Sequence, residues 1–251
     1  MIESILNQLR QLKLSGMAAA LQSQRGQPGT YEGLAFTERL QLLVDQEDQE
    51  RQQRKQDRLQ RMAQFKLKAY PKDIDYENNR GLKPSQIASL LQCDWINKAQ
   101  NLLLTGPCGS GKTYIACALG HQACLKGYST KYYRVSRLTL ALTQAKADGS
   151  YPKFLKNLAG FDLLILDDWG LEPLNDAIRH DIMEIMDDRY GQVATLVMSQ
   201  LPTEQWYQSI GDNTLADAIL DRLMHNAHRI NLKGKSMRKI MNSLTQVEHL
   251  E

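Results

Sequence analysis

The stretch Gly106-Pro107-Cys108-Gly109-Ser110-Gly111-Lys112-Thr113 decides the fold of this chain. It matches the pattern G-x-x-x-x-G-K-[ST], in which backbone amides surround phosphate oxygens at positions where a Cβ would obstruct them. An apolar run over residues 101–105 precedes it, and apolar side chains at helical spacing follow over residues 114–126. This order of strand, loop and helix predicts a phosphate site facing the positive end of the helix.

Each part of this loop has an expected role. We expect all eight residues to bind the phosphates of ATP, with Lys112 reaching the β- and γ-phosphates and the Thr113 hydroxyl coordinating Mg²⁺. The alternative is an ordinary glycine turn between a strand and a helix. That alternative is disfavoured because the pattern and its flanking elements rarely coincide by chance.

A second apolar run, residues 163–166, ends in the adjacent carboxylates Asp167 and Asp168. A buried strand that ends in acids is typical of the Walker B motif, so we expect Asp167 to hold Mg²⁺ through water. Asp168 is expected to orient or deprotonate the attacking water, and this spare carboxylate favours hydrolysis over a kinase reaction. The alternative is that both acids merely cap the next helix.

Runs of strand-forming residues alternate with helical patterns along the chain. The expected strands are residues 101–105, 131–135, 163–167, 195–199 and 229–232. Such alternation predicts an α/β fold with a doubly wound parallel sheet of about five strands. We expect helices over roughly the first 66 residues, interrupted by a loop over residues 24–31, and Tyr70-Pro71 breaks the pattern. The helical stretch over residues 46–61 is almost wholly polar, which indicates either a solvated face or a contact with a partner subunit or DNA. We therefore expect a small all-helical domain over residues 1–68 and an ATPase domain over residues 69–249.

Length and composition are those of an ordinary globular protein, with 251 residues, 42% hydrophobic and 24% charged. The net charge of +3 does not by itself indicate a nucleic-acid partner. No apolar run approaches the ~18 residues of a membrane span, and the start lacks a basic signal-peptide region, so we expect a cytoplasmic protein without membrane contact. The four cysteines form no C-x-x-C pair, which disfavours zinc and predicts free thiols.

Three further side chains are candidates for the γ-phosphate. Gln200 follows the fourth expected strand, whose carboxyl end abuts the ligand crevice of a doubly wound sheet. The alternative for Gln200 is a turn residue before Pro202. Arg222 and Arg238 lie in a basic C-terminal region, and a guanidinium near the γ-phosphate stabilises transition-state charge. A solvated basic surface is the alternative there.

Taken together, these motifs resemble those of AAA+ ATPases of the DnaA/DnaC initiator and helicase-loader group, and in particular IstB-type transposition helper ATPases. The resemblance covers nearly the whole chain. It rests on the phosphate loop and on Asp167-Asp168-Trp169-Gly170, Ser199-Gln200-Leu201-Pro202, Ser236-Met237-Arg238-Lys239 and, near the start, Leu12-Lys13-Leu14-Ser15-Gly16-Met17.

The resemblance implies further roles. Asp168 corresponds to the catalytic acid and Gln200 to the sensor-1 position. Arg222 resembles the arginine finger, which acts on ATP of a neighbouring subunit, and Arg238 resembles the sensor-2 arginine of its own subunit. These two assignments can be exchanged, and Arg229 is a third candidate. Many AAA+ proteins carry glutamate where Asp168 stands, so slow turnover is expected from the shorter side chain here. Many also carry asparagine at the position of Gln200.

The resemblance also implies a helical insertion after the second strand that helps to bind DNA. Its counterpart is about residues 137–156, where basic side chains would contact duplex phosphates without reading bases. The expected DNA contacts are Arg134, Arg137, Lys146, Lys153 and Lys156. A solvated surface is the alternative that composition alone would favour equally.

The expected function is that of a DNA-binding transposition helper. It would oligomerise on duplex DNA with ATP at its subunit interfaces, act with a partner transposase, and be reset by ATP hydrolysis. The nearest alternative is a DnaC-type replicative helicase loader. A nucleotide-gated scaffold without hydrolysis is a third class, and a small-molecule kinase is disfavoured because the sequence offers no acceptor site.

Overall fold

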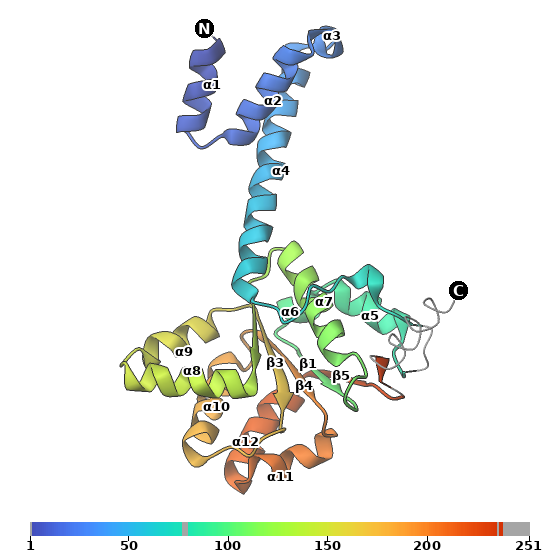
Figure 1. The fold of residues 1–251 in the computed structure, drawn as a ribbon, viewed down its shortest axis with the longest axis vertical. Coiled ribbons are helices and arrows are strands. Elements are labelled where there is room, and N and C mark those ends of the chain that lie inside the picture. The colour runs from blue at the N-terminus through green and yellow to red at the C-terminus, as the bar shows by residue number, and fades with distance from the viewer. Residues whose placement is uncertain (1, 77–79, 235, 238–251) are drawn as a thin grey trace, which may run out of the picture. The chain divides into compact units, whose positions relative to one another are not determined.

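The computed structural model describes residues 2–76, 80–234 and 236–237. It consists of two compact units, Met1–Arg58 and Leu59–Glu251. The predicted domain boundary after residue 68 stays a prediction. Helices and strands carry the labels of Figure 1.

The first unit is helical, as the apolar spacing predicted. It contains α1 (Ile2–Gln11), α2 (Ser15–Gly26), α3 (Pro28–Tyr31) and most of α4 (Phe36–Ala63). Glu47 on α4 is only 6% exposed, and its Oε2 accepts hydrogen bonds from the amides of Gly16 (2.8 Å) and Met17 (3.3 Å). A carboxylate therefore binds the positive N-terminal end of α2, where backbone amides lack intrahelical partners.

The second unit contains a five-stranded sheet in the order β2-β3-β4-β1-β5. Its strands are β1 (Asn101–Thr105), β2 (Thr130–Arg134), β3 (Leu163–Trp169), β4 (Ala194–Ser199) and β5 (Ala227–Asn231). Every pairing is parallel, and Leu103 lies opposite Val197 on one side and Arg229 on the other. The predicted doubly wound α/β fold is confirmed.

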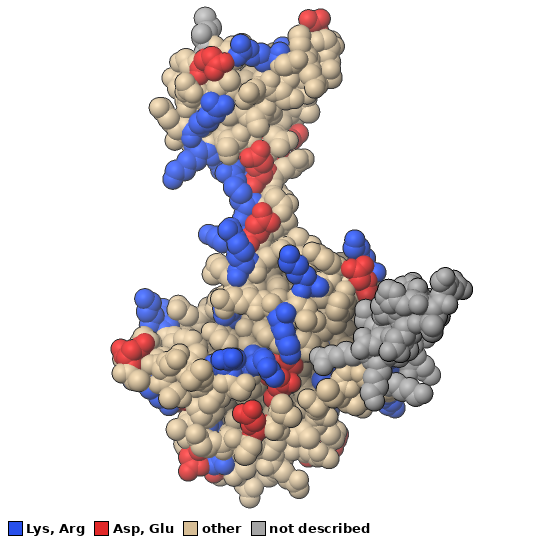
Figure 2. All heavy atoms as spheres, in the orientation of Figure 1, with Lys and Arg blue, Asp and Glu red and all other residues tan. Residues whose placement is uncertain are grey.

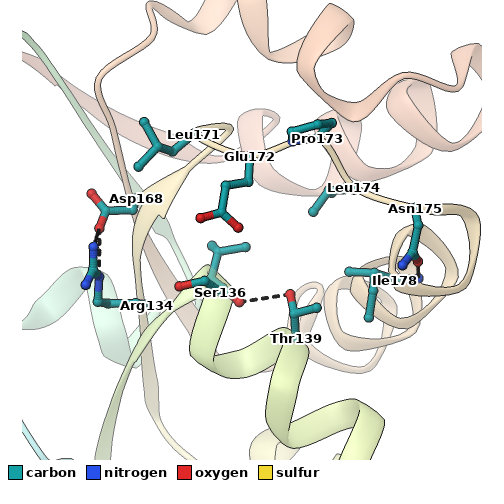
Figure 3. Close-up of a pocket in the computed structure, with 11 residues that line it drawn as sticks. Arg134, Ser136, Thr139, Asp168, Leu171, Glu172, Pro173, Leu174, Asn175 and Ile178 are labelled. Atoms are coloured by element: carbon teal, nitrogen blue, oxygen red, sulfur yellow. Dashed lines mark hydrogen bonds and ion pairs between the residues drawn. The ribbon is translucent and has the colours of Figure 1, made fainter.

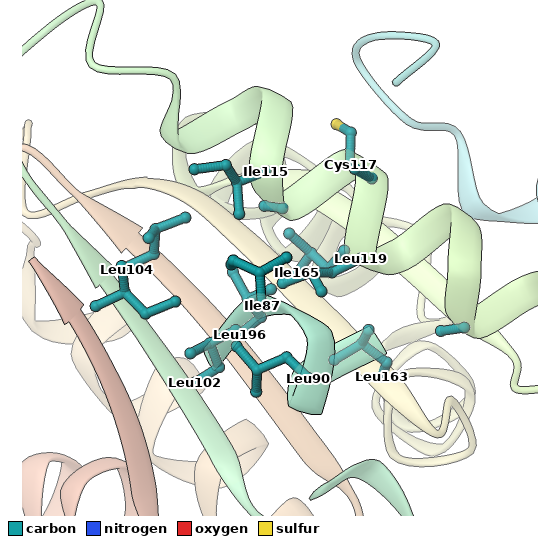
Figure 4. Close-up of a cluster of buried hydrophobic side chains, with 14 of the residues drawn as sticks. Ile87, Leu90, Leu102, Leu104, Ile115, Cys117, Leu119, Leu163, Ile165 and Leu196 are labelled. Atoms are coloured by element: carbon teal, nitrogen blue, oxygen red, sulfur yellow. The ribbon is translucent and has the colours of Figure 1, made fainter. Parts of the chain in front are cut away.

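Helices cover both faces of this sheet, which explains why β1, β3 and β4 are almost continuously buried (Figure 1). On one face lie α5 (Pro84–Leu91), α6 (Asp94–Asn97) and α7 (Lys112–Leu125), preceded by the short turn η1 (Pro71–Asp73). Figure 4 shows the core between α7 and the strands, where Ile115 and Leu119 face Leu102, Leu104 and Ile165.

On the other face a second core joins the remaining helices to the sheet. These are α8 (Val135–Ala147), α9 (Tyr151–Ala159), α10 (Asp176–Arg189), α11 (Trp206–Ile210) and α12 (Asn213–Met224), with the turn η2 (Thr203–Gln205) before α11. The stretch expected to be helical at residues 137–156 thus forms two helices, because Gly149 adopts a positive φ of 77° between them. Across the described ranges, no helix is both long and apolar enough to cross a membrane.

Gly16 offers a test of the helical unit. A Cβ at this position would lie 2.6 Å from the Glu47 Cα and 2.8 Å from the Gln46 carbonyl oxygen, both in the backbone of α4. We expect Gly16→Ala to destabilise the unit by about 1–3 kcal/mol, because the backbones must separate. Gly26→Ala at the other end of α2, where a Cβ meets nothing within 4 Å, should be neutral or stabilising. Urea unfolding measures both, and equal stabilities would contradict this packing.

Candidate nucleotide-binding site

The phosphate loop lies between β1 and α7 in a shape that only glycine adopts freely. Gly106, Gly109 and Gly111 have φ angles of 146°, 79° and 93°. A Cβ on Gly106 would lie 2.5 Å from the Leu232 carbonyl oxygen, and one on Gly109 would lie 2.2 Å from the Ser236 Oγ. Conformation and neighbours therefore both require glycine, and the resulting concavity is the cradle that the sequence pattern predicts.

Lys112, the first residue of α7, lies at the floor of this cradle. Its side chain is buried, and its Nζ donates to the carbonyl oxygens of Gly106 (2.6 Å) and Pro107 (2.9 Å). Burial lowers the pKa of Lys112, while the nearby Cys108 and Asp167 counteract this by favouring the charged form. Two loop carbonyls thus position a cation where a phosphate would bind.

Asp167 at the carboxyl end of β3 is 2% exposed and concentrates donors on one oxygen. Its Oδ2 accepts from the Tyr132 hydroxyl at 2.5 Å and from the Thr113 Oγ1 at 3.2 Å, and it lies 3.5 Å from the Lys66 Nζ. Burial, followed by this hydrogen bond to Asp167, raises the pKa of Tyr132, so the phenol remains a donor. The two residues predicted to hold Mg²⁺ are therefore adjacent.

The chemistry of these oxygens fits Mg²⁺. Within the described ranges, no group of three or more His, Cys, Asp or Glu residues is arranged to hold a metal. Mg²⁺ does not require one, because it keeps several waters and commonly takes its remaining ligands from one or two protein oxygens and the substrate phosphates. The Thr113 hydroxyl and the Asp167 carboxylate supply such oxygens at the mouth of the loop.

Asp168 adopts an unusual backbone conformation. Its φ is +61°, at an irregularity where the pairing of β3 with β4 shifts between Leu166 and Trp169. The carboxylate of Asp168 accepts from Arg134 Nε (2.8 Å) and lies 2.7 Å from Arg134 Nη2 (Figure 3). This hydrogen bond raises the pKa of Arg134. Arg134, expected to contact DNA, therefore pairs with the expected catalytic acid in this chain.

These groups line one cleft of about 520 Å³. Most of the phosphate loop, Asp167, Asp168 and Gln200 line it. The cleft is also lined by residues for which no role in the site was predicted, namely Lys66, Leu67, Asp73, Ile74, Asp75, Arg80, Tyr114, Ile115 and Met237. The side chains expected to bind ATP and Mg²⁺ thus share one cleft at the carboxyl ends of β1, β3 and β4.

Arg80 is a functional candidate that sequence reasoning missed. It is 5% exposed, and its guanidinium donates to the carbonyl oxygens of Ser110 (3.1 Å) and Asp75. A Cβ on Gly111 would lie 2.7 Å from Arg80 Nη1. Its Nε is buried and has no hydrogen-bond partner in the described part of the chain. Arg80 therefore brings a buried positive charge to the wall of the cleft and bonds to the backbone of the phosphate loop.

The other candidate arginines do not reach this cleft within the described chain. Arg222 at the end of α12 pairs with Asp187 on α10 at 2.6 Å. Its carbonyl oxygen accepts from Asn101 at the start of β1, the end of the strand opposite the phosphate loop. Arg229 lies on β5. Arg238 lies outside the described residues, although the neighbouring Met237 amide donates to the Gly109 carbonyl oxygen at 2.9 Å.

The remaining basic residues divide into paired and exposed groups. Lys146 lies 2.6 Å from the buried Asp181 and over the ring of Tyr151, 5.0 Å from its centroid. Its charge is therefore largely compensated. Arg137, Lys153 and Lys156 are exposed, and no carboxylate of the described ranges forms an ion pair with them. On the face drawn in Figure 2, basic side chains of the second unit stand in separate groups, several beside acidic ones.

The strand order, the loop after β1 and the two acids ending β3 define a nucleotide-binding α/β protein of the AAA+ class. Comparison with known proteins identifies the family within this class. The model of the family described as IstB-like ATP binding protein matches residues 7–245. The chain belongs to this family.

Curated relatives support the family assignment, and solved structures show a similar fold. A Sinorhizobium fredii protein named for an insertion sequence and ATP binding is 47% identical over 93% of this chain and 95% of its own length. A similarly named protein of IS1162 from Pseudomonas fluorescens is 48% identical over 81% of this chain and 88% of its own length.

The crystal structure of DnaI has a TM-score of 0.58 at 20% identity, covering 66% of this chain and 91% of that chain. AMPPCP-bound DnaA from Aquifex aeolicus has the same score at 19%, covering 75% and 57%. At these identities the structural likeness shows the fold alone.

Gly109 provides a matched test of the cradle. Gly109 and Gly149 have nearly equal φ angles of 79° and 77°, but a Cβ would meet Ser236 at the first and nothing within 4 Å at the second. We expect Gly109→Ala to weaken binding of a fluorescent ATP analogue by about tenfold or more, because the loop must move. Gly149→Ala should leave affinity unchanged despite similar backbone strain. Equal affinities in both variants would contradict the assignment of this loop.

Proposed function

We propose that this chain is an ATP-dependent helper of transposition, which binds Mg²⁺–ATP in the cleft, assembles on duplex DNA, and hydrolyses ATP to reset the assembly. The observation that carries the proposal is the convergence of Lys112, Thr113, Asp167 and Asp168 on one cleft. The names of relatives with 47% and 48% identity, which refer to insertion sequences, support the link to transposition and to a partner transposase.

In this proposal the loop amides and Lys112 bind the β- and γ-phosphates. Mg²⁺, when bound, neutralises phosphate charge as the γ-phosphoryl group is transferred, and Thr113 and Asp167 would hold it. Asp168 orients the attacking water and accepts its proton, with Gln200 at the end of β4 hydrogen-bonding the γ-phosphate or that water. Asp168 must first release Arg134 before it can bind the water, so the isolated chain is expected to hydrolyse ATP slowly.

Assembly is the second part of the proposal. Arg222 lies at the opposite end of β1 from the phosphate loop. A head-to-tail contact between subunits would bring Arg222 of one subunit to the cleft of the next, and repeated contacts of this kind form rings or helical filaments. The pair between Arg222 and Asp187 opens in this step. Arg238 is proposed to act on the nucleotide of its own subunit, as the position of Met237 beside Gly109 supports.

Contact with DNA is the third part. Arg137, Lys153 and Lys156 are exposed and carry uncompensated charge, so they are suited to duplex phosphates. Lys146 and Arg134, expected from the sequence to act with them, must first leave Asp181 and Asp168. We therefore assign the larger share of any phosphate contact to the first three residues, with no base-specific readout.

A replicative helicase loader is the second candidate. The solved structures with similar folds include the DnaC helicase loader, with a TM-score of 0.50 at 22% identity. The relatives at 47% and 48% identity are instead named for insertion sequences, which favours transposition. Pull-down by the full chain of its cognate transposase, against a replicative helicase as the competing bait, distinguishes the two.

Assembly tests the proposal as a whole. We expect Lys112→Ala and Asp167→Asn to abolish ATP-dependent oligomerisation on duplex DNA. Lys112→Ala removes a phosphate contact, and Asp167→Asn removes the negative charge proposed to hold Mg²⁺. Analytical ultracentrifugation of each variant with ATP, Mg²⁺ and DNA measures the species, with the wild type in ADP as the control. Normal assembly of either variant would rule out nucleotide as the bridge between subunits.

The pair between Arg134 and Asp168 generates a separate prediction. Arg134→Gln should raise the rate of phosphate release without DNA by about threefold to tenfold. The reason is that Asp168 no longer has to break its ion pair with Arg134 before it can bind the attacking water. Arg137→Gln, three residues along and unpaired with any described carboxylate, is the control and should match the wild type. A fall to the level of Asp168→Asn would mean instead that Arg134 holds the acid in its working orientation.

A further inference from the structure

The segment that follows α4 forms one wall of the nucleotide cleft. Phe65 packs on α7 at Gly120, where a Cβ would lie 2.6 Å from the Phe65 ring. Burial raises the pKa of the Cys117 thiol, and the backbone of Leu67 and Lys66 beside it counteracts this rise. Lys66 and Leu67 both line the cleft. Backbone and ring contacts thus fix where the Lys66 side chain begins.

Lys131 on β2 secures the same segment from the other side. Its Nζ donates to the Met62 carbonyl oxygen at 3.2 Å and to the Gln64 Oε1 at 2.7 Å. Gln64 itself has a positive φ of 55°, which ends α4 and turns the chain towards the cleft. The approach of Lys66 to the site is therefore built into the fold of the second unit.

The Lys66 ammonium lies beside the carboxylate expected to face the metal. Lys66 Nζ is 3.5 Å from Asp167 Oδ2, and this oxygen also faces the Thr113 hydroxyl. The Asp167 side chain is 3% exposed and that of Lys66 is 35% exposed. A cation therefore reaches a buried carboxylate from the solvent side, next to the hydroxyl that would ligate Mg²⁺.

We propose that Lys66 is a built-in charge substitute for Mg²⁺, pairing with Asp167 until the Mg²⁺–nucleotide complex displaces it. The inference rests on the proposed function, since it takes Mg²⁺ to bind beside Thr113 and Asp167. Mg²⁺ held at Asp167 would repel the Lys66 ammonium. Thr113 and the nucleotide phosphates would supply further oxygens for Mg²⁺, whereas Lys66, with its side chain 35% exposed, retains solvent as an alternative partner.

Two consequences follow from this exchange. Before nucleotide binds, Lys66 adds to the charge compensation that the nearby Lys112 gives the buried Asp167, which limits the cost of burying this carboxylate. When Mg²⁺ enters, the segment of residues 64–70 loses its tie to the end of β3. Lys66 thus sets the Mg²⁺ dependence of nucleotide binding and connects metal occupancy to the chain that leads out of α4.

A double-mutant cycle tests the exchange. The full chain is prepared as wild type, Lys66→Met, Asp167→Asn and the double variant, with Lys68→Met as the control at an exposed lysine two residues along. Affinity for a fluorescent ATP analogue is measured in EDTA and in Mg²⁺, and the ratio of the two dissociation constants reports the enhancement by Mg²⁺. We expect Lys66→Met to raise this ratio by about threefold to tenfold, and Lys68→Met to leave it unchanged.

The effect of Lys66→Met in the Asp167→Asn background distinguishes two explanations. In the first, Lys66 and Mg²⁺ compete for the Asp167 carboxylate, and in the second, Lys66 simply attracts the nucleotide phosphates. Under the proposal, Lys66→Met has no further effect on the ratio once Asp167 is neutral. An equal rise in both backgrounds, or no rise in either, would overturn the role of Lys66 while leaving nucleotide binding intact. Failure of the wild type to bind the analogue in Mg²⁺ would overturn the proposed function and this inference with it.

Hydrogen exchange gives a second readout that does not depend on affinity. Exchange of the peptide containing residues 64–70 should increase in the wild type when Mg²⁺ is added to the analogue-bound chain. In Lys66→Met it should already be fast in EDTA, and Lys66→Arg should behave like the wild type because the charge is kept. Exchange in the wild type that is indifferent to Mg²⁺ would refute the displacement.

Discussion

The structure depends on one constraint, which is that parallel strands end at the same edge of a sheet. With β1 between β4 and β5, and β3 next to β4, the phosphate loop, Asp167 and Gln200 follow neighbouring strand ends. The loop can close there only because Gly106 and Gly109 leave room for the backbone of Leu232 and for Ser236. Helices on both faces fix the strands, which brings a few polar side chains at this edge within hydrogen-bonding distance of one another.

The charged side chains of the site are paired with other groups of the same chain. Lys66 lies against Asp167, Arg134 pairs with Asp168, and Lys112 bonds to carbonyls of its own loop. Each charge that the proposed reaction uses is thus compensated by another group of the same chain, which limits the cost of its burial. Activation, in this account, consists of replacing these internal partners with phosphate, metal and water.

The fold was predictable because its signals are local. Runs of strand-forming residues predicted the strands, helical spacing predicted the helices, and the eight-residue loop pattern located the phosphate cradle. The partners around the site are distant in the chain and carry no such pattern. Lys66 is 101 residues from Asp167, Tyr132 is 35 residues from it, and Arg80 is 30 residues from Ser110. Composition also could not separate Lys146, which is paired with Asp181, from the exposed Lys153.

In the proposed assembly, Mg²⁺–ATP fills this cleft where two subunits meet on DNA. The decisive measurement is electron microscopy of the full chain with a non-hydrolysable ATP analogue, Mg²⁺ and duplex DNA. We expect nucleotide density against Lys112 and Thr113 in every subunit, with an arginine of the neighbouring subunit beside the γ-phosphate. An assembled particle in which that cleft holds no nucleotide would contradict it.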